Sequence, residues 1–267
     1  MGRAVSSLAL DHALRRDRAL VLTGLGALVA VAWLYLGRGA AGMEMEHMPA
    51  GVTMAMPAMA TWTLTELLTL VAMWIVMMVA MMVPSAAPIV LMFTALERKQ
   101  PVGAAPVGRA GLFVLGYLCV WTLFSVAAAA AQWALHAAAL MSPMMTTTSP
   151  ILVGLLLIAA GAFQGTPLKR ACLATCRSPI GFLMGEWRDG PRGAVVMGLR
   201  HGAICLGCCW LLMALLLVAG VMNLLWVAAI TAFVLVEKAL PRGEAIARGA
   251  GILLVVAGLL MLTRIWI

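Results

Sequence analysis

The sequence predicts an all-α protein, a polytopic transmembrane helical bundle of about seven spans with a cytoplasmic N-terminus and an external C-terminus. Three observations support this prediction. Hydrophobic residues make up 64% of the chain and charged residues 10%, which excludes an ordinary soluble domain. Apolar runs close to the ~20 residues that cross a bilayer recur along the sequence. The basic residues lie almost entirely between those runs.

The first predicted span, residues 19–36, follows a basic N-terminal segment. Small residues at 40–42 resemble a signal-peptide cleavage site, but the apolar run is longer than the ~7–15 residues of a signal peptide, which favours a retained helix. Pro84 and Pro88 are expected to kink the second span or break it in two. The spans after the first are predicted at residues 64–96, 110–132, 151–165, 194–219, 224–236 and 249–262.

The whole chain, residues 1–267, is predicted to form a single integral membrane domain. Its parts are an N-terminal tail with the first span (1–37), an external loop rich in Met and His (38–63), and a six-span core (64–264). The predicted partner along the spans is the lipid bilayer.

Orientation follows from the basic residues. With the N-terminus inside and seven spans, sixteen of the eighteen Lys and Arg residues lie on the cytoplasmic side, and Arg38 and Arg264 alone lie outside. Cytoplasmic loops of membrane proteins carry such an excess. The net charge of +8 therefore reflects membrane orientation, and no nucleic-acid partner is predicted.

A histidine and three cysteines are concentrated in the segment RHGAICLGCCW, residues 200–210. His201, Cys205, Cys208 and Cys209 are spaced i, i+4, i+7 and i+8, so a helix places them on one stripe. Cys172 and Cys176 form a second pair at i, i+4, expected at the cytoplasmic end of the fourth span. Thiolates select Cu(I), Zn or Fe–S centres. The alternative interpretation is that these cysteines are small packing residues.

Methionines form a second candidate set of soft ligands. In the second span Met73, Met77 and Met81 recur every four residues, and Met78 and Met82 lie on the adjoining stripe. Neutral thioethers suit Cu(I) or Ag(I) inside a membrane, although Met also packs irregular helix contacts. The external loop adds further candidates for metal capture, unless it is a simple connector: Met43, Met45, His47 and Met48.

Three other residues bear on the thiols. Arg200, beside His201, either extends its side chain to the membrane surface or stabilises nearby thiolates. Lys238, with its neighbour Glu237, is expected to anchor the sixth span at the cytoplasmic face. Cys119 is expected alone and buried towards the outer side.

Several strings occur together between Trp62 and Lys238: MWIVMMVAMMVPSAAP, TPLKRACLATCRSP, HGAICLGCCWLLM with GVMN and VEK, and Tyr117 with Trp121, Phe124 and Ser125. In this combination the chain resembles a prokaryotic family of predicted metal-binding integral membrane proteins of unassigned function. The resemblance implies a multi-pass protein of the bacterial cytoplasmic (inner) membrane with a soft-metal site.

The predicted function is to bind a soft metal ion and to move it across the membrane or hand it over. Cu(I) is the favoured ion and Zn the alternative; a metallochaperone or a periplasmic metal-binding protein is the expected partner. Two alternatives stay open, a transmembrane thiol–disulfide electron carrier and a membrane assembly factor with structural cysteines. No phosphate loop, G-x-S-x-G motif or Rossmann glycine pattern occurs, so no enzyme is predicted.

Overall fold

The computed structural model describes residues 2–46, 63–100, 105–138, 140, 149–220 and 223–263, with side chains described only from residue 11 to residue 40 in the first range. All regular secondary structure in these ranges is α-helical, which confirms the all-α part of the predicted fold class. The helices are α1 (Gly2–Glu46), α2 (Leu64–Arg98), α3 (Pro106–Ala137), α4 (Pro150–Gln164), α5 (Pro167–Arg177), α6 (Pro179–Glu186), α7 (Gly190–Ala214), α8 (Leu216–Ala219), α9 (Leu224–Ala239) and α10 (Gly243–Thr263).

Polar caps fix where several helices begin. Thr63 and Glu66 form a capping box at the start of α2, in which each side chain accepts a hydrogen bond from the other residue's backbone N–H. Thr166 caps α5 in a similar way by accepting from the Lys169 N–H, and Pro167 occupies the first position. This second start comes directly after the fourth predicted span, residues 151–165, which α4 matches closely, and α4 and α5 meet at an angle of 61°.

The prolines in α2 do not break the helix. It runs as one element from Leu64 to Arg98 with Pro84 and Pro88 inside it. Of the two predicted effects, the break is therefore wrong, and the kink stays a prediction. Hydroxyl groups supplement the backbone bonding near the prolines: Ser85 donates to the Met82 carbonyl at 2.8 Å, and Tyr117 of α3 donates to the same oxygen at 3.2 Å. The carbonyls that lose their usual N–H donor to Pro84 and Pro88 are those of Ala80 and Pro84, so these two bonds lie near the prolines without replacing the missing ones.

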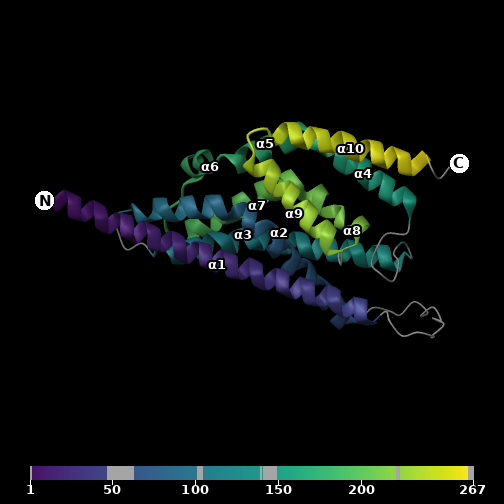
Figure 1. Ribbon diagram of the computed structural model, residues 1–267, viewed down its shortest axis with the longest axis horizontal. Coiled ribbons are helices and arrows are strands. Elements are labelled where there is room, and N and C mark those ends of the chain that lie inside the picture. The colour runs from purple at the N-terminus through teal and green to yellow at the C-terminus, as the bar shows by residue number, and fades with distance from the viewer. Residues whose placement is uncertain are drawn as a thin grey trace.

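Among the described residues, five segments are long and apolar enough to cross a membrane: Asp11–Ala40, Leu64–Arg98, Pro106–Ala137, Gly190–Ala219 and Gly243–Thr263. The bent pair α4 and α5 makes a sixth if it counts as one span. Helix α9 has 16 residues, just short of the ~17–25 that a span takes. Seven spans and their direction therefore stay a prediction. The start of α1 and the end of α10 lie at opposite ends of the described structure (Figure 1).

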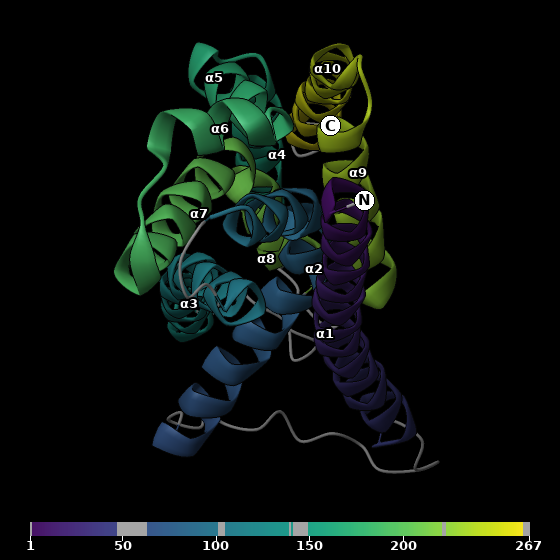
Figure 2. The ribbon, with the colours of Figure 1, turned by 90° about the vertical axis from the view of Figure 1, so that its left-hand side faces the viewer.

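The helices gather around a core shared by α2, α3, α7 and α9, with α1 along one side and the α4–α10 pair along another (Figures 1 and 2). Glycines bring α3 and α7 together. A Cβ atom added to Gly198 would lie 2.0 Å from the carbonyl oxygen of Phe113, so only glycine permits this approach.

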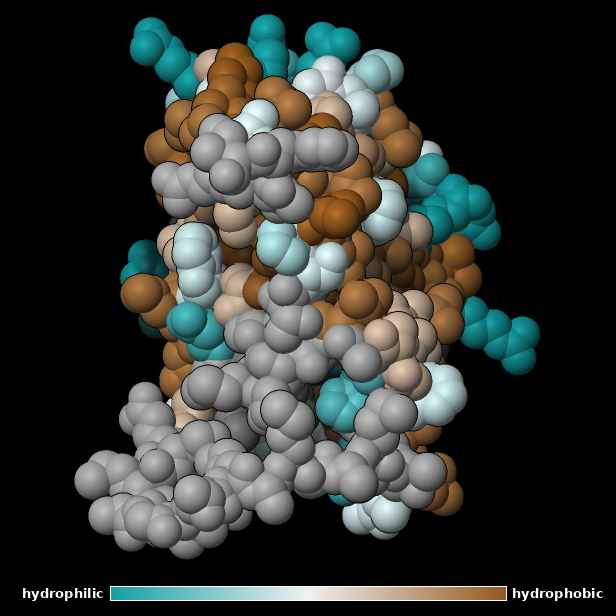
Figure 3. Space-filling view, turned by 90° about the vertical axis from the view of Figure 1, so that its right-hand side faces the viewer, coloured by the Kyte–Doolittle hydropathy of each residue, from teal (hydrophilic) through white to brown (hydrophobic). Residues whose placement is uncertain are grey.

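The outside of the bundle is apolar. Leu123, Leu225 and Leu253 are each more than 70% exposed. Hydrophobic residues also cover much of the visible surface at the C-terminal end, with hydrophilic ones mainly at its rim (Figure 3). Exposed apolar area on this scale marks an interaction surface, and with helices of spanning length the surface is that of a membrane protein.

Helix α1 is longer than the first predicted span. It continues past residue 36 to Glu46, so the segment after the span begins as helix and not as loop. Met43 and Met45 lie on its last turn, but their side chains are not among those described. His47 and Met48 lie outside the described residues, and metal capture by this segment stays a prediction.

Candidate metal centre

Helix α7 carries the predicted thiol stripe into the interior of the bundle. His201, Cys205, Cys208 and Cys209 all lie on this helix and all four side chains are buried, at most 3% exposed. The helical spacing and the inward orientation are therefore as expected. Whether the four residues bind metal stays a prediction.

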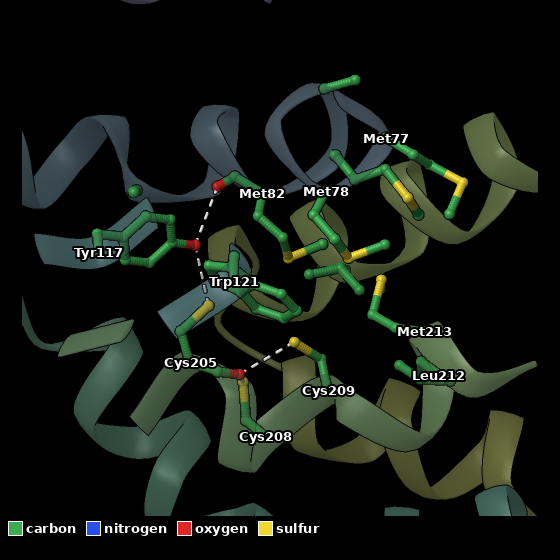
Figure 4. Close-up of a cluster of buried hydrophobic side chains, with 14 of the residues drawn as sticks. Met77, Met78, Met82, Tyr117, Trp121, Cys205, Cys208, Cys209, Leu212 and Met213 are labelled. Carbon is green, nitrogen blue, oxygen red and sulfur yellow. Dashed lines mark hydrogen bonds between the residues drawn. The ribbon is translucent and has the colours of Figure 1, made fainter. Parts of the chain in front are cut away.

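Cys205 is the most closely contacted of these thiols. Its sulfur lies 3.1 Å from the Tyr117 hydroxyl of α3 and 3.0 Å from the Lys238 ammonium of α9. Figure 4 shows the first of these contacts. The same Lys238 nitrogen donates to the Ser85 hydroxyl of α2 at 3.0 Å. Three helices thus meet at the Cys205 sulfur, and Lys238 links the sulfur to a fourth, α2, through Ser85.

The two cysteine segments meet, as the sequence suggested. The helix α5 packs on α7, where the Cys176 thiol lies within interaction range of the Cys205 and Cys208 thiols. A Cβ atom added to Gly207 would lie 2.9 Å from the sulfur of Cys172, so a glycine on α7 makes room for that thiol. Five of the six cysteines therefore gather at the α5–α7 contact, and all six are free thiols.

The thiols of Cys208 and Cys209 are held by their own helix. Both donate to the Cys205 carbonyl oxygen at 3.0 Å. In the described part of the chain, no group of three or more His, Cys, Asp or Glu side chains is placed to hold a metal ion. The predicted Cys and His ligands are therefore close together, but they do not form a ready cage of three or four donors.

His201 occupies an aromatic enclosure beside the thiols. Its ring stacks on Tyr117, with centroids 5.8 Å apart and planes 28° apart, and meets the Phe182 ring edge-on at 5.2 Å. Its Nδ1 atom is buried and has no hydrogen-bond partner. An unpaired buried nitrogen is costly, so this atom is a ready donor to a bound ion.

The methionine stripe faces the thiols across the interior. Met73, Met77, Met78, Met81 and Met82 are all buried in the same core cluster as the α7 cysteines. Met78 and Met82 point towards Met213 and Cys209 of α7 (Figure 4). Met213 was missing from the sequence prediction, although its position one turn after Cys209 could have revealed it.

Comparison with known protein families gives one match, to the family described as PpoB2, copper chaperone, over residues 71–261. The chain belongs to this family. No curated protein and no solved structure matches it. The matched residues of this copper chaperone family member include the five methionines of α2 and the α5 and α7 thiols, but not residues 43–48.

Two charged residues near the thiols differ from expectation in this copper chaperone family member. Arg200 is 46% exposed and pairs with Glu186, so the interpretation that it stabilises the thiolates is wrong. Lys238 contacts Cys205 instead of only anchoring its helix. A lysine directly after an apolar run was the available signal, but its partner could not be read from the sequence.

Beside Lys238 lies a buried ion pair. The Lys169 ammonium of α5 donates to both Glu237 carboxylate oxygens of α9 at 2.9 Å, and it also contacts the Gln164 side chain. Lys169 and Glu237 are 1% and 2% exposed. The pair fixes the end of α9 against α5, and thus the position of Lys238 relative to the thiols.

Cys119 does not belong to the cluster. It is exposed on α3, contrary to the prediction that it is buried. Its position on the outer face of the bundle makes it a suitable control for experiments on the other five cysteines.

Proposed function

We propose that this protein binds Cu(I) as cargo inside the membrane and hands it over to a partner through sulfur ligands. The observation that carries the proposal is the meeting of thioethers and thiols in one buried region. Met78 and Met82 of α2 face Met213 of α7, and Cys209 lies in the same buried cluster (Figure 4). Membership of a copper chaperone family supports copper as the ion and hand-over as the task.

The chemistry of these donors suits the proposed cargo. Thioethers are neutral and soft, so they can pass a monovalent copper ion along a membrane helix without a charged lining. Thiolates bind the same ion more strongly and provide the end of the path, at Cys205, Cys208, Cys209, Cys172 and Cys176. The unpaired His201 Nδ1 adds a nitrogen donor. Zn is the alternative cargo, since it accepts Cys and His ligands.

The proposed route begins outside the membrane. Met43, Met45, His47 and Met48 would collect the ion, the α2 methionines would relay it, and the α5–α7 thiols would receive it on the cytoplasmic side. Since no nucleotide-binding motif occurs, a gradient would drive the movement, and the same path serves either direction. The partner would be a metallochaperone or a periplasmic metal-binding protein.

The first test is elemental analysis of the full-length protein, purified anaerobically in reduced form and loaded with Cu(I). The wild type is compared with two variants: one with Cys205, Cys208 and Cys209 changed to Ser, and the control Cys119→Ser. We expect near-stoichiometric copper in the wild type and the control, and its loss in the triple variant. Equal copper in all three would overturn the thiol site.

A second test addresses the methionines. The double variant Met78→Leu, Met82→Leu keeps the side-chain volume nearly constant, so the fold should tolerate it. In sealed vesicles we expect slower copper entry with copper still bound at the thiols, whereas Met184→Leu, at a residue 79% exposed, should behave as wild type. Unchanged entry in the double variant would exclude the relay.

One observation favours thiol–disulfide exchange as a second candidate function. The Cys176 thiol lies within interaction range of two α7 thiols. Oxidation of one such pair to a disulfide would release two electrons and two protons to an acceptor disulfide or quinone. A reversible disulfide in a protein that stays metal-free would favour this function. A protein that neither binds metal nor forms a reversible disulfide would favour the third alternative, a membrane assembly factor with structural cysteines.

A further inference from the structure

We propose that Lys238 makes the thiol cluster select a monovalent soft cation over a divalent one. The inference rests on the proposed function and concerns the selectivity of the same site. Its basis is the position of the Lys238 ammonium, 3.0 Å from the Cys205 sulfur and 3.0 Å from the Ser85 hydroxyl. Any ion bound by Cys205 therefore lies close to a fixed positive charge.

Lys238 forms no ion pair with a carboxylate among the described residues, although Glu237 interacts with it electrostatically. The adjacent Glu237 is the nearest candidate in sequence, but both of its oxygens accept from Lys169. The groups that interact with its ammonium, apart from Ser85, include Tyr117, Cys176, Cys205 and Cys208, and the charge also acts on His201 and Glu237. Thiols are therefore the most numerous of the groups around the Lys238 ammonium.

Coulomb repulsion grows in proportion to the charge of the ion. At the same position beside Lys238, a divalent ion is repelled twice as strongly as a monovalent one, and a membrane interior screens such repulsion poorly. Lys238 thus weakens the binding of Zn(II) more than that of Cu(I) or Ag(I).

Charge balance acts in the same direction. Two thiolates around a monovalent ion carry one net negative charge, which Lys238 neutralises. The same two thiolates around a divalent ion are neutral, so Lys238 would remain as an uncompensated buried charge, which is costly. A third thiolate would restore the charge balance for Zn, but the described side chains offer no preformed group of three such donors.

Ser85 keeps the lysine in place when an ion arrives. Its hydroxyl donates to the Met82 carbonyl and accepts from Lys238, so the ammonium retains one hydrogen-bond partner after Cys205 has bound the ion. The positive charge therefore stays beside the site in the loaded protein, where it can discriminate between ions.

The test compares metal affinities of the reduced full-length protein in detergent, by competition with chelators, for Cu(I), Ag(I) and Zn(II). Lys238→Leu removes the charge, Lys238→Arg keeps it, and Lys99→Leu removes an exposed charge elsewhere. We expect Lys238→Leu to raise the affinity for Zn(II) relative to Cu(I) and Ag(I) by at least about fivefold, the effect of one unit charge at about 4 Å in bulk water. Lys238→Arg and Lys99→Leu should keep the wild-type ratio.

An unchanged ratio in Lys238→Leu, with copper binding still dependent on Cys205, would overturn this inference and leave the proposed function standing. If the wild type bound no soft metal at all, both would fail. Should Lys238→Leu not fold, Lys238→Gln, which keeps a hydrogen-bond donor without the charge, serves as the deciding variant.

Discussion

The ammonium of Lys238 lies 3.0 Å from the sulfur of Cys205, a residue 33 positions away in the sequence. This contact joins the end of α9 to the middle of α7, and through Ser85 it reaches α2. A positive charge and a buried thiol are thereby placed together between helices that otherwise bury apolar side chains. The proposed preference for a monovalent ion depends on this one contact.

The meeting of α5 and α7 predicts a specific cross-link. In a variant that keeps only Cys176 and Cys205, with the other four cysteines changed to Ser, a mild thiol oxidant should produce an intrachain disulfide, because Cys176 lies within interaction range of Cys205. Mass spectrometry of proteolytic peptides would identify it. A variant that keeps only Cys119 and Cys176 should stay reduced within the chain, and failure of the first pair to react would contradict the described packing.

Tyr117 is expected to contribute to stability through its hydroxyl. Tyr117→Phe removes the contacts with the Met82 carbonyl and the Cys205 sulfur but keeps the ring that stacks on His201. The free energy of unfolding should fall by about 1 kcal/mol, measured by denaturant unfolding in detergent. Tyr35→Phe is the matched control, since Tyr35 is 49% exposed, and should leave unfolding unchanged. Equal curves for both variants would argue against the buried contacts.

The Lys169–Glu237 pair should be sensitive to loss of one partner. Glu237→Gln leaves the Lys169 ammonium buried without its counter-charge, and we expect a loss of about 3–5 kcal/mol in the free energy of unfolding. Adding Lys169→Met to that variant should recover part of the loss.

The control for this ion pair is Glu244→Gln, whose partner Arg248 is 59% exposed and 3.9 Å away. An exposed pair of this kind contributes at most about 1 kcal/mol. A similar loss in Glu237→Gln and Glu244→Gln would show that the Lys169–Glu237 pair is not buried in solution.

Close approach of α3 and α7 gives a further prediction. Gly198→Ala would push a Cβ atom against the Phe113 carbonyl and separate the two helices, at a cost of about 1–3 kcal/mol. Gly111→Ala, on α3 where no atom lies within 4 Å of the added Cβ, should instead stabilise its helix by about 0.5–1 kcal/mol. Thermal unfolding should show a lower melting temperature for Gly198→Ala and a higher one for Gly111→Ala. Shifts of the same sign in both variants would contradict the prediction.

Local features were predictable where the sequence contains their cause. His201 and Cys205 lie on one face of α7 because they are four residues apart, and this spacing can be read from the sequence alone. The effect of Pro84 was not predictable in the same way, because α2 continues through it with hydroxyl groups from Ser85 and Tyr117 bonding nearby. Tyr117 is more than thirty residues away, and its contribution depends on how α3 packs.

The sequence by itself determined that this is a helical membrane protein with thiols on one helix face and methionines on another, because hydropathy and helical period are local properties. Only the tertiary structure decided which charge meets those thiols. Arg200 is next to His201 in sequence yet lies near the surface with Glu186, whereas Lys238 reaches Cys205 from another helix. The physical reason is that neighbouring residues on a helix point about 100° apart, so contact depends on how helices pack and not on sequence distance.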